Sequence, residues 1–96
     1  MLHTIYTSPY ATSSLGLCLN YAQKNSEILL AEDAVIAAVE QGYWYPRLIS
    51  SGYRVYALVD DLNARGLTTK IGDGIELVDI KGFINLTENH FSQIKW

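Results

Sequence analysis

The chain has 96 residues, too few for two independent cores, so the sequence predicts one domain spanning residues 1–96. Hydrophobic residues make up 49% of the chain and charged residues 18%, which excludes a disordered or polyelectrolyte protein. The formal net charge of -3 excludes the broad basic surface expected of a direct nucleic-acid binder. A small domain with so few charges is expected to keep apolar surface available for a protein partner.

Cysteine use predicts a reducing compartment. Cys18 is the only cysteine, so no intrachain disulfide can form, and no CxxC or Cys/His cluster offers zinc or iron-sulfur ligation. The first residues lack a positively charged leader, and no window reaches the roughly 18 apolar residues of a membrane helix. We therefore expect a cytoplasmic protein that is neither exported nor anchored.

The first half of the chain is predicted to form a strand, a helix and a second strand. Residues 2–6 form a short, largely apolar run that favours a β-strand, and residues 7–9 resemble a turn. Apolar positions at 15, 18, 19 and 22 have the spacing of an amphipathic helix over about residues 13–23. Residues 27–31 begin at Glu27 and continue with four apolar residues, as in a strand buried on both faces of a parallel sheet. Asp33 is then expected to cap a short apolar helix that runs to Val39.

The second half continues the alternation. Residues 43–46 are expected to form an aromatic loop before a helical turn over 47–50, and residues 53–59 a third strand. Asp60 or Asp61 is expected to cap a helix through Arg65, which Gly66 ends. A fourth strand over 75–80, a helix over 83–87 and a short strand over 94–96 complete the pattern. The predicted fold is a three-layer α/β/α sandwich with a mostly parallel sheet of four to five strands.

Signals for familiar chemistry are weak. Neither GxGxxG nor GxxxxGK[ST] occurs, and Gly72-Asp73-Gly74 is expected to be a turn. His3 lies within a predicted strand, where a structural role is expected, and His90 is expected to be solvated. The Asp60-Asp61 pair is interpreted as helix capping rather than as a metal or acid/base site. No metal or cofactor is predicted.

Cys18 carries the only chemistry that no other residue could replace. It lies on the apolar stripe of the first predicted helix, where a free cysteine often packs as a small hydrophobe. The nearest cation in sequence, Lys24, is more than a helical turn away, and Cys18 is not at a helix N-terminus that would favour a thiolate. The residues alone favour packing over reactivity.

Aromatic residues could form either core or interface. Tyr43, Trp44 and Tyr45 are the first candidates for a partner surface, because aromatic side chains are enriched in interface cores. They could equally cover one side of the sheet, and Trp96 has the same two interpretations.

Several short segments resemble the TusB/DsrH family over essentially the whole chain. The opening Met1-Leu2-His3-Thr4 followed by Ser8-Pro9 is similar to the start of that family. The other matching segments keep the same order: Leu17-Cys18-Leu19, residues 29–33 with Ala37-Ala38, Val55-Tyr56-Ala57-Leu58, Asp61-Leu62, Ala64-Arg65-Gly66-Leu67 and residues 93–96. Their order and spacing together carry the resemblance.

The resemblance implies a subunit of a sulfur-relay complex without a metal or organic cofactor. Family members assemble with TusC/DsrF-like and TusD/DsrE-like chains into an α2β2γ2 heterohexamer. The TusBCD version implies persulfide transfer from TusA, through the complex, to TusE for 2-thiouridine formation at the tRNA wobble position. The DsrEFH version implies sulfur handling in sulfur-oxidising metabolism.

The resemblance also divides the chemistry among the subunits. The TusD/DsrE-like subunit carries its sulfur-accepting cysteine between its third strand and the following helix, a position that falls at about Leu58 here. With no thiol there, this chain is expected to be structural rather than principal catalytic. DsrH-like members share a cysteine in the first helix, so the resemblance keeps Cys18 as a candidate persulfide carrier.

Three functions therefore stay open from the sequence. The first is a non-catalytic subunit, the second a sulfur carrier that uses Cys18, and the third an independent small ligand-binding α/β module. The third would have a polar pocket at the carboxyl ends of its strands.

Overall fold

Five parallel strands form the centre of the molecule in a computed structural model that describes all of residues 1–96. The sheet has the order β4-β3-β2-β1-β5, and every neighbouring pair is parallel. The strands are β1 (Leu2–Ile5), β2 (Glu27–Leu30), β3 (Arg54–Leu58), β4 (Ile75–Val78) and β5 (Gln93–Lys95). The predicted three-layer α/β fold is confirmed.

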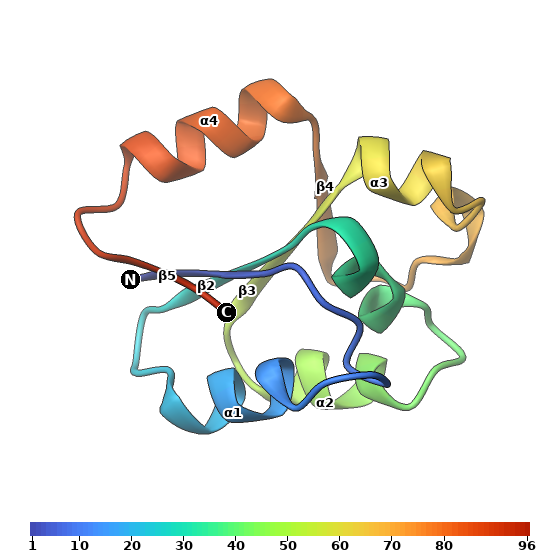
Figure 1. Cartoon of the computed structure of the whole chain (residues 1–96), viewed down its shortest axis with the longest axis horizontal. Coiled ribbons are helices and arrows are strands. Elements are labelled where there is room, and N and C mark those ends of the chain that lie inside the picture. Colours follow the sequence, from blue (N-terminus) through green and yellow to red (C-terminus); the bar gives the residue numbers. More distant parts are fainter.

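The helical elements lie on both sides of the sheet. Figure 1 shows α1 and α2 together on one side and α4 on the other. The helical elements are α1 (Ser14–Tyr21), the 3-10 helix η1 (Glu32–Ala38), α2 (Trp44–Ser50), α3 (Val59–Ala64), the 3-10 turn η2 (Thr68–Lys70) and α4 (Ile80–Glu88). None of them is long and apolar enough to cross a membrane.

The two faces of the sheet are covered unequally. Ile28 and Val55 are register partners and belong to the larger core cluster of 13 buried residues, together with Leu15 and Cys18 of α1. Side chains alternate across a strand, so the neighbouring positions face the other way. There, a cluster of only three buried residues, Leu2, Leu29 and Tyr56, packs with partly buried side chains that include Phe83 and Leu86 of α4. The face under α4 is therefore thinly covered.

Two helical segments in the middle of the chain differ from the sequence predictions. Residues 32–38 form a 3-10 helix whose N-cap is Ala31, so the prediction that Asp33 caps this segment was wrong. Residues 44–46 are the first turn of α2 rather than a loop. Pro46 is tolerated there because backbone N–H groups in the first turn of a helix have no partner within the helix, so the N–H that proline lacks is not needed.

The start of α4 was predicted too late. The helix begins at Ile80 rather than at Phe83, and Asp79 caps it by accepting a hydrogen bond from the backbone N–H of Gly82 at 2.8 Å. Gly82 has a low helix propensity, which hid this first turn in the sequence.

Two glycines occupy the positions predicted for them, one at the end of a helix and one in a turn. Gly66, after α3, has a φ of 66°, and Gly74 has a φ of 92° in the turn before β4. Both angles lie in the left-handed region that glycine adopts without steric cost.

Candidate functional site

The carboxyl end of β3 is the first candidate site, because the family resemblance implies a sulfur-accepting cysteine there in a related subunit. Leu58 is the last residue of β3 and immediately precedes α3. Its side chain is only 7% exposed. A hydrocarbon side chain at this point offers no atom that could attack or carry sulfur.

Asp61 lies just beyond Leu58 and holds the backbone of a neighbouring element. Its Oδ2 accepts a hydrogen bond from the backbone N–H of Glu32 at 2.6 Å. Glu32 has a φ of 50°, a left-handed conformation that costs a non-glycine residue roughly 1–2 kcal/mol. The prediction that Asp60 or Asp61 caps α3 was wrong: the N-cap is Leu58, and no side chain accepts a hydrogen bond there. Both carboxylates instead lie in the first turn.

Arg65 links this end of α3 to η1. Its guanidinium donates to Asp33 Oδ1 from NH2 at 2.8 Å and from Nε at 3.2 Å. It also lies 3.7 Å from Asp61 Oδ1. The Asp33 side chain is 70% exposed, so this pair contributes at most about 1 kcal/mol to stability. Asp33 and Asp61 are thus engaged in structural contacts.

Cys18 is enclosed by the larger core cluster. The residue is fully buried. Burial raises the pKa of its thiol from 9.0 to about 12, because the apolar surroundings disfavour the thiolate. The thiolate is the nucleophilic form, so these surroundings favour packing over sulfur chemistry. A persulfide-carrying role for Cys18 stays a prediction.

The two histidines have different environments. His3 is fully buried in β1, and Trp96 Nε1 donates a hydrogen bond to its Nδ1 at 3.1 Å. His90 was expected to be solvated, and that prediction was wrong. Its side chain is 16% exposed, and its Nε2 lies 2.6 Å from Glu27 Oε1.

Glu27 gathers a polar network beneath α4. Its Oε2 accepts a hydrogen bond from the Tyr56 hydroxyl at 2.9 Å, while Oε1 contacts His90. Arg54 lies 3.9 Å from the same carboxylate. Burial opposes ionisation, but the hydrogen bonds from His90 and Tyr56 and the nearby charges outweigh it and lower the pKa of Glu27. No periodic pattern in the sequence predicts this network, because its residues come from three separate segments.

The aromatic segment before α2 divides between core and surface. Trp44 is half-buried against the larger core cluster, while Tyr43 is 58% exposed. The Arg47 guanidinium lies 4.3 Å from the centre of the Tyr43 ring. Tyr45 donates a hydrogen bond to the backbone carbonyl of Asp73. Only Tyr43 of the three presents most of its ring to the surface.

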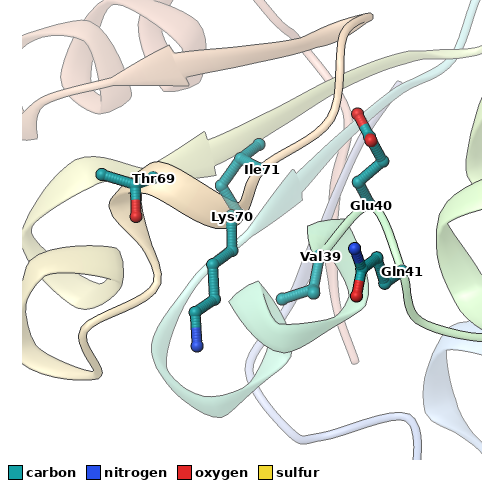
Figure 2. Close-up of a pocket in the computed structure, with 6 residues that line it drawn as sticks. All are labelled: Val39, Glu40, Gln41, Thr69, Lys70 and Ile71. Atoms are coloured by element: carbon teal, nitrogen blue, oxygen red, sulfur yellow. The ribbon is translucent and has the colours of Figure 1, made fainter.

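A shallow pocket of about 420 Å³ lies between the end of η1 and the segment around η2. It is lined by Val39, Glu40, Gln41, Thr69, Lys70 and Ile71. Figure 2 shows the Glu40 carboxylate and the Lys70 ammonium pointing in opposite directions. Polar groups that converge on one point are the usual mark of a small-ligand site, and these two do not converge. No group of three or more His, Cys, Asp or Glu side chains is placed to hold a metal ion.

The fold itself has solved relatives. The E. coli ychN protein superposes with a TM-score of 0.75 at 18% identity, covering 99% of this chain and 97% of that one. Protein MTH1491 of Methanobacterium thermoautotrophicum gives a TM-score of 0.73 at 14% identity, with coverage of 99% and 96%. At these identities the likeness shows a shared fold.

Sequence comparison identifies the family. The profile of the family described as "DsrH like protein" matches residues 7–93. The chain therefore belongs to the TusB/DsrH family, as the sequence resemblance predicted. Within that family it is similar to Protein TusB of Escherichia coli strain K12, with 42% identity over 96 residues and 100% of both chains covered. Protein TusB of Escherichia fergusonii is 41% identical over the same length.

Proposed function

We propose that this chain is a structural subunit of a heterohexameric sulfurtransferase that supports persulfide transfer for 2-thiouridine formation at the tRNA wobble position. The observation that carries the proposal is the 42% identity to Protein TusB over the full length of both chains. The hydrocarbon side chain of Leu58 and the burial of Cys18 support a structural rather than a principal catalytic role.

The proposed partners are TusC/DsrF-like and TusD/DsrE-like chains in an α2β2γ2 assembly in the cytoplasm, with TusA and TusE acting through the complex. Exposed apolar side chains support a partner-dependent protein. Leu17 and Tyr21 are about half exposed on α1, and Ile80 and Ile84 are about half exposed on α4. Such side chains are available for burial by neighbouring subunits.

The chemistry in this proposal takes place on cysteines of the partners. An acceptor thiolate attacks the outer sulfur of a donor persulfide, the sulfur–sulfur bond of the donor breaks, and the donor leaves as a thiolate. The sulfane sulfur moves and a new persulfide forms, with no external oxidant or reductant. This chain would position the subunit that carries the acceptor.

Genetic complementation tests the proposal. An E. coli strain that lacks its own TusB should regain 2-thiouridine when it expresses this chain, measured by mass spectrometry of digested tRNA. An affinity tag on this chain should co-purify the TusC-like and TusD-like subunits. If 2-thiouridine stays absent although the chain is expressed and co-purifies with both partners, the proposed tRNA function is wrong.

The Cys18 carrier is separated from the structural subunit in the same strain. Cys18→Ser should leave both co-purification and the 2-thiouridine level unchanged, because the buried thiol has a raised pKa. An assembled Cys18→Ser complex that no longer transfers sulfur would instead establish the carrier role. A mass increase of one sulfur atom on Cys18 after incubation with a persulfide donor would support the same alternative.

A further inference from the structure

His3 holds a buried N–H group whose orientation follows from its neighbour. An indole N–H can only donate, so the bond from Trp96 Nε1 to His3 Nδ1, at 3.1 Å, requires Nδ1 to be unprotonated. Burial, with a smaller contribution from the positive amino terminus, lowers the pKa of His3 and so favours the neutral ring. The neutral ring therefore carries its proton on Nε2.

The Nε2–H group has no acceptor within the chain. It is buried, and no other atom of the protein accepts its hydrogen bond. A buried donor without a partner costs roughly 1–3 kcal/mol. The carboxylate of Glu27 is not available to it, because its two oxygens already contact Tyr56 and His90. Glu27 also pairs in register with Leu2 rather than His3, so it faces the other side of the sheet.

His3 instead lines a small pocket of about 120 Å³ at the start of β1 and β2. The pocket has room for about four water molecules, at roughly 30 Å³ each. None of its lining side chains is acidic, and Lys24 takes part in none of the ion pairs. Its lining residues are Met1, His3, Tyr21, Gln23, Lys24 and Ser26.

The rim of the pocket is free to rearrange. Gln23 and Lys24 are exposed, while Ser26 is buried beside them. Long exposed side chains change rotamer within nanoseconds, so Gln23 and Lys24 can swing aside to admit a ligand to the imidazole. The lining then offers an imidazole N–H, an ammonium, a hydroxyl and an amide as donors.

We propose that this pocket binds a small inorganic oxyanion such as phosphate, with His3 Nε2 donating a hydrogen bond to it and Lys24 supplying the positive charge. Charge-assisted hydrogen bonds to an anion are stronger than neutral ones, so an oxyanion satisfies the buried donor better than a neutral acceptor. The site lies outside the Leu58 region and does not depend on sulfur transfer.

Nitrogen-15 NMR of the two imidazoles tests the proposal on the full-length chain. Long-range ¹H–¹⁵N spectra should first show the Nε2–H tautomer for His3. Phosphate is then titrated at constant pH and ionic strength, replacing chloride. The His3 Nε2 resonance should shift and reach saturation, while the His90 resonances serve as the internal control because His90 faces Glu27.

Charge-matched variants locate the site. Lys24→Gln should weaken phosphate binding about two- to fivefold, the range expected from losing one exposed charge contact. Lys81→Gln removes the same charge from exposed α4 and should leave the affinity unchanged. The proposal is overturned if His3 carries its proton on Nδ1, if its resonance does not saturate, or if the two variants weaken binding equally.

Discussion

The reactivity of Cys18 can be predicted quantitatively from its burial. At pH 8 a thiol with the ordinary pKa of 9.0 is about one-tenth thiolate, whereas a pKa of about 12 leaves roughly one molecule in ten thousand ionised. The thiolate is therefore about a thousandfold scarcer in the folded chain. Because Cys18 is fully buried, access of a reagent to the sulfur is restricted as well.

Alkylation by iodoacetamide measures this difference. The rate is followed at pH 8 by intact mass, once for the native chain and once in concentrated guanidinium chloride, where the thiol is free. Cys18 is the only thiol, so each added label reports on it alone, and Cys18→Ala supplies the blank. We expect native alkylation to be slower by about a thousandfold or more. A native rate within about tenfold of the unfolded rate would refute the burial argument and favour a reactive Cys18.

Three further outcomes follow from polar contacts. The pKa of Glu27 is lowered in the folded state, so the stabilisation from its carboxylate is present above about pH 4.5 and lost as the pH falls. Glu27→Gln should therefore flatten the decline of the unfolding free energy in acid, and an unchanged decline would contradict this. Asp61→Asn should lower the free energy of urea unfolding by about 1–2 kcal/mol, because it weakens the hydrogen bond from the Glu32 N–H. Asp60 is exposed, so Asp60→Asn should change this free energy by under about 0.5 kcal/mol, and equal losses would refute a structural role for the Asp61 hydrogen bond. Asp79→Ala should cost about 0.5–2 kcal/mol by removing the cap of α4, and unaltered thermal and urea midpoints would show that the cap contributes nothing.

The strands were predictable because their signal is local. Residues 27–31 and 53–59 are short runs that become continuously apolar after Glu27 and Arg54, and they match β2 and β3 within one residue at each end. Parallel strands buried on both faces leave this pattern wherever they occur. The alternation of strands and helices then led to the three-layer architecture.

Side-chain partners were not predictable in the same way. Asp33 and Asp61 are of a residue type that often caps helices, but each contacts another element instead. Asp33 accepts a hydrogen bond from Arg65, and Asp61 accepts one from the Glu32 N–H. His90 contacts Glu27 across 63 positions of sequence. Propensity describes a residue and its near neighbours, whereas these contacts depend on how distant elements pack.

For the candidate site at the end of β3, the sequence predicted mainly that a reactive thiol is missing. The hydrocarbon at Leu58 was evident once the chain was matched to its family. The spacing of the first helix favoured packing of Cys18 but left its burial open, and the structure shows that it is buried. The unpartnered N–H of His3 could not be foreseen, because it requires the ring of Trp96 to reach across 93 positions of sequence.

The pairing of β1 with β5 bears on how the chain folds during synthesis. Among the five strands of the sheet, β1 comes first along the chain and β5 comes last, yet they lie side by side. Until β5 has been synthesised, one edge of β1 offers unpaired backbone groups that could recruit a strand from another nascent chain. Closing contacts so distant in sequence is also slow. During synthesis the free edge of β1 can therefore pair with a wrong strand. β5 is only three residues long, but it covers this edge of β1 once it has been made.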